Sequence, residues 1–391
     1  MIEAPVRARD LGIVIGEGRP GPLNAITDVA GVAVGHATLI RGDGPLVVGQ
    51  GPVRTGVTVV LPHDGNVWSE PVFAGSHTLN GNGELTGLEW IREGGFLNGA
   101  IGLTNTHSVG VVRDALVHAA SRAGLAGSLD WSLPVVGETW DGRLNDIDGQ
   151  HVTAAHVDAA LAAASAGPVA EGNVGGGTGM IRHEFKGGIG TASRRLPADL
   201  GGWTVGVLVQ ANYGRRGLLR VDGVPVGEAI PTSEVPSPHG RVRRGLAEAG
   251  SGNEPPPGAG SIIGIVATDA PLLPHQCRRI AQRASLGLAR VGGLGATSSG
   301  DLFLAWATGN RGLPASEARE AGDGVLSVKV LHDPGLDPLF EATVEATEEA
   351  ILNALVAAET MTGRDGIIAH RLPHDRLVET MRRAGRLRGR H

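Results

Sequence analysis

The amino-acid sequence predicts a mixed α/β fold in which helices are layered on packed sheets. Many short, β-branched apolar runs are separated by glycine turns, which is typical of strands in a sandwich. Four or five longer segments have helical spacing, and they do not alternate regularly with the strands. A doubly wound parallel sheet requires that alternation, so layered helices and sheets fit the sequence better.

The composition narrows the class of protein. The chain has 391 residues, of which 63 are glycine, 41% are hydrophobic and 3% are aromatic. This balance indicates a compact fold with many tight turns, in one large or two medium domains. The formal net charge is −6 and arginines are spread along the chain, so no nucleic-acid partner is predicted. Neither lysine, Lys186 or Lys329, follows a glycine, which excludes a P-loop.

Cysteine content and hydropathy exclude further classes. Cys277 is the single cysteine, so an intrachain disulfide and a cysteine zinc cluster are excluded. Residues 1–12 lack the apolar core of a signal peptide, and no run reaches membrane-spanning length. We therefore expect a cytoplasmic protein without a membrane partner, and we predict no metal and no cofactor.

Strand-type runs and polar loops dominate the first part of the chain. Two polar loops, residues 80–84 and 103–110, each lead into a predicted helix. The free N–H groups of these helices either line a site or are capped by the Asn and Ser of the loops. The strand-type runs are residues 11–15 and 57–61, and the two helices are residues 85–93 and 111–123.

An acidic segment follows a short apolar strand at residues 134–142. Its Glu138 either faces solvent, as acids in such a segment usually do, or belongs to a site. A helix rich in alanine is predicted at residues 152–164. The glycine run at residues 173–180 lacks the lysine and the βαβ spacing of a phosphate loop, so it predicts a tight corner packed under a sheet.

A predicted strand at residues 203–211 ends in Asn212. Asparagine at a strand end is either a turn residue or a donor of amide hydrogens to a developing oxyanion. From residue 225 to residue 260 the composition becomes polar and rich in proline, which is typical of a linker.

The linker-like stretch ends at Ser261, where a buried strand is predicted to begin. Gly260 allows the strained backbone that attack of the Ser261 hydroxyl on the preceding carbonyl requires. That attack, followed by hydrolysis, would split the chain and leave a free α-amine as base for the serine hydroxyl. The alternative is an ordinary serine after a loop, and this stretch alone leaves both open.

The C-terminal part contains two predicted helices and one further strand. Ser299 and Asp301 share a face if the strand at residues 302–305 begins a little early, because strand side chains alternate. The apolar stripe of the last long helix indicates core packing. The helices are residues 274–289 and 339–361, and the arginine-rich end, residues 382–390, is expected to be a solvated tail.

Six segments form a specific combination of motifs. In chain order they are GPLNAITDVAGVAVGH from Gly21, NTHSVGVVRDA from Asn105, VGETWDG from Val136, QANYG from Gln210, GSIIGIVATDAPLLPHQ from Gly260 and SSGD from Ser298. Together they resemble the L-aminopeptidase/D-esterase family, the serine-nucleophile group that includes the β-peptidyl aminopeptidases. The resemblance covers about residues 7–373. It implies one domain with a four-layer αββα sandwich, similar to N-terminal-nucleophile hydrolases but with a different connectivity.

The resemblance also implies self-cleavage between Gly260 and Ser261, giving an α chain of residues 1–260 and a β chain of residues 261–391. Ser261 matches the nucleophile and Asn212 the oxyanion donor. Glu138 matches the acid that receives the free ammonium of the substrate. A serine–acid pair near the nucleophile is matched by Ser299 and Asp301.

Two positions depart from some members of that family. Trp140, in the expected substrate-binding segment, replaces a tyrosine, and its indole N–H cannot perform acid–base chemistry. Asp301 is shorter than the glutamate of some relatives. The chemistry needs no histidine, because the α-amine of Ser261 can take the role of the base.

The implied activity is that of an aminopeptidase acting on peptides or on amino-acid amides and esters, including L-, D- or β-amino acids. The implied assembly is a homo-oligomer of αβ units, with four αβ units as the expected number. One alternative is an acyltransferase like the ornithine acetyltransferases, although their nucleophile is threonine, and Ser261 argues against it. The other alternative is a non-catalytic assembly protein with the same fold.

Overall fold

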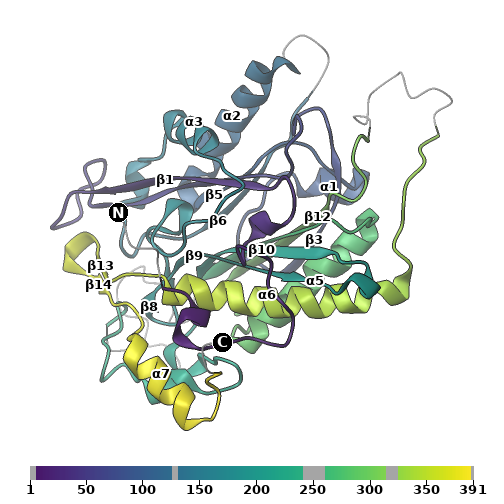
Figure 1. Ribbon diagram of the computed structural model, residues 1–391. Helices are drawn as coiled ribbons and strands as arrows, with labels where there is room; N and C mark the ends of the chain where they lie inside the picture. Colours follow the sequence, from purple (N-terminus) through teal and green to yellow (C-terminus); the bar gives the residue numbers. More distant parts are fainter. Residues whose placement is uncertain (1–5, 126–130, 241–259, 314–324, 389–391) are drawn as a thin grey trace.

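The computed structural model describes residues 6–125, 131–240, 260–313 and 325–388. Within these residues the strands form a four-stranded and a six-stranded sheet, with helices on both outer faces. Figure 1 shows the four layers from top to bottom, helices, sheet, sheet and helices. The αββα sandwich that the sequence resemblance implies is therefore confirmed.

The four-stranded sheet has the order β1-β2-β5-β6. Its first three strands pair antiparallel, whereas β5 and β6 are parallel and are connected through helix α2. The strands are β1 (Ala33–Arg41), β2 (Val53–Leu61), β5 (Ile101–Asn105) and β6 (Val135–Thr139).

The six-stranded sheet has the order β4-β3-β12-β11-β10-β9. Its central pair, β11 and β12, is parallel and connected through helix α5, and the other pairs are antiparallel. Two short hairpins lie outside the large sheets. The six strands are β3 (Val72–Gly81), β4 (Phe96–Leu97), β9 (Gly188–Arg195), β10 (Thr204–Asn212), β11 (Ser261–Thr268) and β12 (Gly300–Ala307), and the hairpins are β7 (Ile181–Arg182) with β8 (Phe185–Lys186) and β13 (Met361–Thr362) with β14 (Ile368–Ala369).

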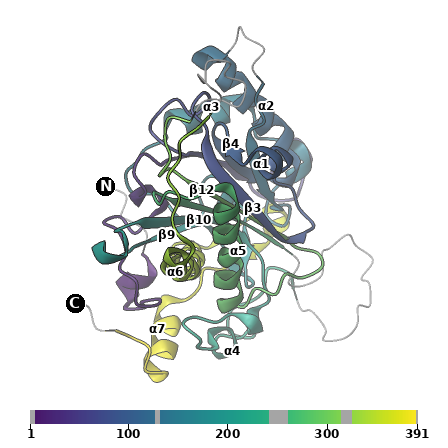
Figure 2. The ribbon, with the colours of Figure 1, turned by 90° about the vertical axis from the view of Figure 1, so that its right-hand side faces the viewer.

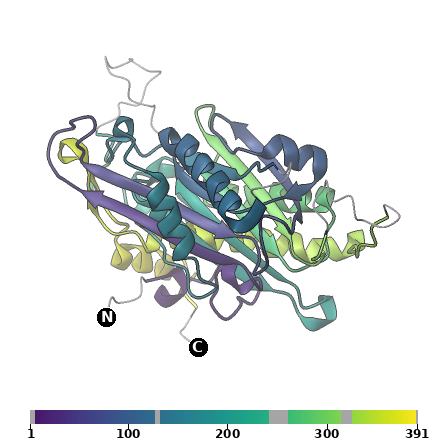
Figure 3. The same cartoon turned by 90° about the horizontal axis from the view of Figure 1, so that it is seen from above.

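Two pairs of helices cover the sandwich. Helices α2 and α3 pack on the four-stranded sheet and lie over its strands in the view from above (Figure 3). Helices α5 and α6 pack on the six-stranded sheet, and Figure 2 shows α6 end-on beside α5. The helices are α1 (Leu88–Gly94), α2 (Val109–Ala120), α3 (Ala154–Ala162), α4 (Val226–Ala229), α5 (Pro274–Arg290), α6 (Leu336–Val356) and α7 (His374–Arg383).

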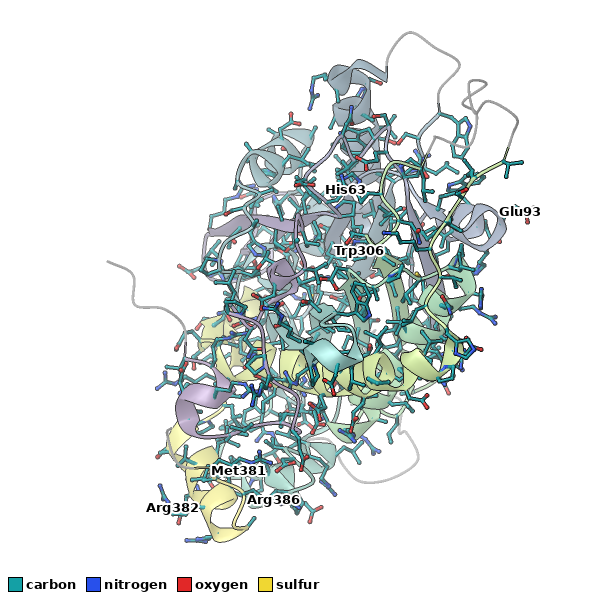
Figure 4. The ribbon with its side chains drawn as sticks, turned by 45° about the vertical axis from the view of Figure 1, so that its right-hand side comes forward. His63, Glu93, Trp306, Met381, Arg382 and Arg386 are labelled. Atoms are coloured by element: carbon teal, nitrogen blue, oxygen red, sulfur yellow. The ribbon has the colours of Figure 1, made fainter. Side chains whose placement is uncertain are left out.

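The central strands are apolar on both faces because each face meets another layer. In β11, Ile262 packs toward α5 and α6, whereas Ile263 and Ile265 point into the layer between the sheets. Side chains alternate along a strand, so an unbroken apolar run indicates a strand that is buried on both sides. Trp306 of β12 is fully buried in the layer between the sheets, and its indole nitrogen donates to the Pro62 carbonyl oxygen at 3.1 Å (Figure 4).

Most predicted helices and strands are confirmed within a few residues, but one prediction was wrong. Residues 11–15 are not a strand in the structure. Ile13 and Ile15 are buried in the core without a ladder partner, after a short 3₁₀ helix. The described arginines of the C-terminal end are exposed, as predicted for a solvated tail, and they are Arg382, Arg383, Arg386 and Arg388. The neighbouring residues nevertheless attach this end to the rest of the protein. Met381 of α7 is buried, and Arg386 forms an ion pair with Asp222 at 3.6 Å. Figure 4 labels Met381 and Arg386 at the lower edge of the molecule.

Among the described residues, no helix is both long and apolar enough to span a lipid bilayer.

Candidate active site

Ser261 is the first residue of β11 and is almost completely buried. It lies opposite Asn212, the last residue of β10, in the antiparallel register of the two strands. Its hydroxyl oxygen accepts a hydrogen bond from the Gly300 N–H at 3.0 Å. The ends of three neighbouring strands therefore meet at this serine.

Gly260, which precedes Ser261, has a backbone that glycine alone adopts easily. Its φ is +153°, and a Cβ at this position would collide with the carbonyl oxygen of Asn212. Both the positive φ and the close approach explain why a residue without a side chain is needed here. A residue with a side chain at position 260 would be strained, whereas glycine fits without strain.

The carboxamide of Asn212 is held from both sides. Its Oδ1 accepts the Ile181 N–H at 2.8 Å, and its Nδ2 donates to the Trp140 carbonyl oxygen at 2.9 Å. The bond to Trp140 uses one of the two hydrogens on Nδ2. Asn212 thus has a fixed amide orientation, and it still belongs to β10, where it lies opposite Ser261.

Ser299 and Asp301 contact each other, as predicted from the alternation of side chains along a strand. The Ser299 hydroxyl lies 2.7 Å from Asp301 Oδ2 and also 2.7 Å from the Ala296 carbonyl oxygen. Burial raises the pKa of the Asp301 carboxyl to about 6, although hydrogen bonds from the Ser299 hydroxyl and from the Ile262 N–H lower it. The strand begins at Gly300, earlier than the apolar run, so the pair flanks the residue that donates to Ser261.

Glu138 lies at the end of β6, on the other sheet, and is only 3% exposed. One oxygen accepts the Glu84 N–H at 3.0 Å, and the other accepts the hydroxyl of Thr106. Burial raises the pKa of the Glu138 carboxyl, and these two hydrogen bonds oppose that effect. The solvent-facing alternative for Glu138 is therefore wrong.

One cavity of about 700 Å³ connects the two sheets at this end of the sandwich. Ser261, Asn212, Glu138 and Trp140 all lie on its wall. A smaller cavity of about 160 Å³ next to it has Ser299 and Asp301 on its wall. Tyr213 borders both cavities. The structure therefore brings four of the predicted residues into one cavity and places the serine–acid pair directly behind it.

Trp140 contributes to the site mainly through its backbone. Its carbonyl accepts the Asn212 amide, and its indole lies over Gly142, where a side chain would collide with the ring. Trp140 is also one of the residues on the wall of the larger cavity.

Sequence analysis missed three polar residues at the site. Thr106 holds the carboxylate of Glu138, and its position in a polar loop before a helix was the available signal. Asp141 and Lys186 are fully buried behind Asn212, and each has a pKa shifted by burial to about 7. The second of these lies in a mostly polar hairpin, residues 181–186, so the local sequence gives no signal of its burial. Within the described ranges, no cluster of His, Cys, Asp or Glu side chains is arranged to hold a metal ion.

Comparison with known proteins gives a consistent result. Residues 24–369 match peptidase family S58. The β-peptidyl aminopeptidase BapA of Sphingosinicella microcystinivorans is 50% identical over 381 residues, which are 97% of this chain and 93% of that protein.

Two solved structures resemble the chain over nearly its whole length. A β-aminopeptidase from Burkholderia sp. has a TM-score of 0.87 and 56% identity, over 97% of this chain and 99% of that one. The L-aminopeptidase D-Ala-esterase/amidase of Ochrobactrum anthropi has a TM-score of 0.85 and 42% identity, over 98% and 99%. The latter is described as a new variant of the Ntn hydrolase fold. By sequence and by architecture, this chain belongs to peptidase family S58 and has a variant of the N-terminal-nucleophile hydrolase fold.

Proposed function

We propose that this aminopeptidase uses Ser261 as its nucleophile and binds the free ammonium of its substrate at Glu138. The aminopeptidase class follows from the family and from the relatives. The observation that carries the assignment of residues is that Ser261, Asn212 and Glu138 lie on the wall of one cavity. A nucleophile, an amide donor and a buried anion in one space are the groups that hydrolysis at a free N-terminus requires.

Maturation begins with attack of the Ser261 hydroxyl oxygen on the carbonyl carbon of Gly260. The C–N bond of the peptide breaks as the acyl group moves to the hydroxyl oxygen, and the nitrogen becomes the free α-amine of Ser261. Water then hydrolyses the ester and leaves the Gly260 carboxylate. The backbone at Gly260 supports this proposal, because its positive φ and the close carbonyl oxygen of Asn212 require a residue without a side chain next to the bond that is split. The products are an α chain of residues 1–260 and a β chain of residues 261–391.

In the mature enzyme the α-amine of Ser261 accepts the hydroxyl proton as the oxygen attacks the substrate carbonyl. The Asn212 Nδ2 donates to the oxyanion, and the ammonium then gives its proton to the leaving amine. Water enters, loses a proton to the α-amine and releases the acyl group as a free acid. Ser299 and Asp301 flank Gly300, whose N–H binds the Ser261 oxygen, so we assign them to positioning this segment.

Glu138 makes the enzyme selective for free N-termini. Its carboxylate is held by two donors and lies in the substrate cavity, where an ammonium group would compensate its burial. Because two relatives, 50% and 45% identical to this chain, are named as β-peptidyl aminopeptidases, peptides with an N-terminal β-amino acid are the substrate class that we propose first.

The mature protein is proposed to be a cytoplasmic homo-oligomer of αβ units. Exposed apolar side chains near the C-terminal part support a protein–protein contact, because isolated apolar patches on soluble proteins often mark interfaces. They are Val325, Leu326, Val328 and Val330.

Intact mass of the purified protein tests the proposal. The wild type is expected to consist of two chains of 260 and 131 residues, since 391 − 260 = 131. Ser261→Ala is expected to stay one chain and to lack activity toward a panel of β-, L- and D-amino-acid p-nitroanilides. A fully active wild type that remains unsplit would refute the proposed maturation.

A further inference from the structure

Lys186 is fully buried directly behind the proposed oxyanion donor. It lies on β8, in the short hairpin with β7, and its side chain returns beneath that hairpin. The side-chain nitrogen donates to the carbonyl oxygens of Met180 and Gly187, both at 2.8 Å, and lies 3.4 Å from the carbonyl oxygen of Gly177. All three acceptors are backbone carbonyl oxygens, and two of them also accept backbone N–H groups, the Met180 oxygen from Gly187 at 2.9 Å and the Gly177 oxygen from Met180 at 3.2 Å.

One peptide bond connects Lys186 to Asn212. The carbonyl of Met180, which accepts from the lysine, and the N–H of Ile181 belong to the same planar group. That N–H donates to the Oδ1 of Asn212 at 2.8 Å. Fixing the carbonyl of this peptide therefore also fixes its N–H, and with it the direction in which the Asn212 amide hydrogens point.

The same peptide is held by neighbouring groups as well. The Gly187 N–H donates to the Met180 carbonyl oxygen at 2.9 Å, and the Thr139 hydroxyl contacts the Met180 sulfur at 2.9 Å. The hydrogen bonds run in one direction, from Lys186 through the peptide to the carboxamide of Asn212. In such a chain each bond polarises the next, which makes the last donor stronger.

A buried lysine is energetically unfavourable at a position where the side chain only has to fill space. Burying an amine without a carboxylate in direct contact costs free energy, and burial lowers the pKa of Lys186 to about 7 although the Asp141 carboxylate opposes that shift. Methionine has a similar length and would fill the space without this cost. A donor at this point is useful when the orientation of the Met180–Ile181 peptide matters for the reaction.

We propose that Lys186 is a positioning residue for catalysis, which orients and polarises the Asn212 amide through the Met180–Ile181 peptide. The proposal rests on the proposed role of Asn212 as oxyanion donor. Lys186 does not touch the substrate, so its removal should slow the chemical step and leave substrate binding nearly unchanged.

A double-mutant cycle tests this inference. Asn212→Ala is expected to lower kcat about 10²- to 10³-fold, and Lys186→Met about tenfold with KM nearly unchanged. The double variant should be no slower than Asn212→Ala alone, because the lysine acts only through the asparagine. Self-cleavage passes through a similar oxyanion, so its rate, measured by intact mass, should show the same pattern. Rates are normalised to the fraction of split protein.

Two further variants keep the test independent of folding. Lys186→Gln retains an N–H donor and should give rates between those of the wild type and Lys186→Met. Arg194→Met is the control for loss of a buried cation. Arg194 also donates to backbone carbonyls, although it pairs with Glu345 and Glu349 as well. It lies on β9 opposite Val205, at the end of β10 far from Asn212. This variant should lower the melting temperature without lowering kcat per folded molecule.

The outcomes distinguish the role of Asn212 as oxyanion donor from the role of Lys186 as positioning residue. If Asn212→Ala leaves kcat unchanged, the proposed oxyanion donor is wrong, and the role of Lys186 falls with it. If Asn212→Ala is slow but both Lys186 variants keep the wild-type kcat, only the present inference is overturned. Additive losses in the double variant would also overturn it, because they would show that Lys186 acts by a route other than Asn212.

Discussion

Glu138 shows how two sheets contribute to one site. The carboxylate lies on β6, while its hydrogen-bond donors come from the loops that contain Glu84 and Thr106. Thr106 follows β5 of the same sheet as Glu138, whereas Glu84 follows β3 of the six-stranded sheet, which also carries Ser261. In the proposed mechanism the carboxylate that binds the ammonium and the attacking oxygen lie on different sheets, so the distance between them depends on sheet-to-sheet packing.

Glu138→Gln is expected to lower kcat/KM sharply for substrates with a free amine. Loss of one partner of a buried, hydrogen-bonded charge pair costs about 2–5 kcal/mol, which corresponds to roughly 30-fold or more. Steady-state kinetics with free and N-acetylated forms of one amide provide the measurement. Acetylated substrates should be poor for the wild type and no poorer for the variant.

Glu84→Gln is the matched control, because it removes a carboxylate from the same cavity at an exposed position. It should change kcat/KM much less than Glu138→Gln does. Equal hydrolysis of free and acetylated substrates by the wild type would contradict an ammonium site at Glu138.

Asp301 gives a pH dependence to stability. Burial raises the pKa of its carboxyl from 3.8 to about 6, so the folded protein holds this proton more tightly than the unfolded chain does. The protonated Asp301 carboxyl makes its full contribution to the free energy of unfolding below about pH 4. This contribution, about 3 kcal/mol for a pKa shift of roughly two units, is lost as the pH rises through about 6.

Asp301→Asn cannot ionise and should lack this loss. Melting temperatures of the variant and its parent, both in the single-chain Ser261→Ala background, should therefore diverge from pH 4 to pH 7 in favour of the variant. A difference that stays constant over this range would show that the carboxyl titrates as it does in the unfolded chain.

At the scale of elements, the junction between the linker-like stretch and β11 depends on one glycine. Gly260→Ala should strain the unsplit chain, because its Cβ would meet the Asn212 carbonyl at a positive φ. In the Ser261→Ala background, the melting temperature should fall by several degrees, as expected for roughly 1–3 kcal/mol of backbone strain.

Gly223→Ala is the comparison for this effect. Gly223 also has a positive φ, of +77°, but a Cβ there would meet no atom within 4 Å. The excess destabilisation of Gly260→Ala over Gly223→Ala therefore isolates the collision with Asn212. Equal melting temperatures for the two variants would mean that the backbone at Gly260 can relax at no cost.

Elements with a strong local pattern could be predicted from the sequence. Helix α5 was predicted as residues 274–289 and is observed as Pro274–Arg290, because a proline start and an apolar stripe define it locally. Residues 11–15 have the apolar pattern of a strand, but a strand also needs a partner for its backbone hydrogen bonds. No local pattern shows whether such a partner is present.

The same distinction applies to the site. Gly260 and Ser261 were recognisable because a polar, proline-rich stretch changes to a strand at one residue. Whether Asn212 opposes Ser261 depends on the register of β10 and β11, and only the family resemblance indicated it before the structure. The burial of Glu138 and the contact of Lys186 with the Met180 peptide are tertiary, and neither is encoded in spacing along the chain.

At the scale of the whole molecule, we expect assembly into four αβ units. Gel filtration of the split protein should give four times the mass of one unit, the number that the family resemblance implies. The exposed apolar residues within 325–330 are the proposed contact between units. Replacement of Val328 and Val330 by lysine should shift the elution toward a smaller species. Elution of the wild type at the mass of one unit would contradict the assembly.

The strand order β4-β3-β12-β11-β10-β9 has a consequence for the mature enzyme. After cleavage at Ser261, the pair β12-β11 would belong to one chain and the strands on both of its sides to the other. The two polypeptides would be interleaved within a single hydrogen-bonded sheet, with α5 and α6 of the shorter chain closing one face. They could separate only if the sheet itself came apart. The cut would therefore create a reactive terminus without creating a dissociable subunit, and two fragments made separately would have to fold together to form the enzyme.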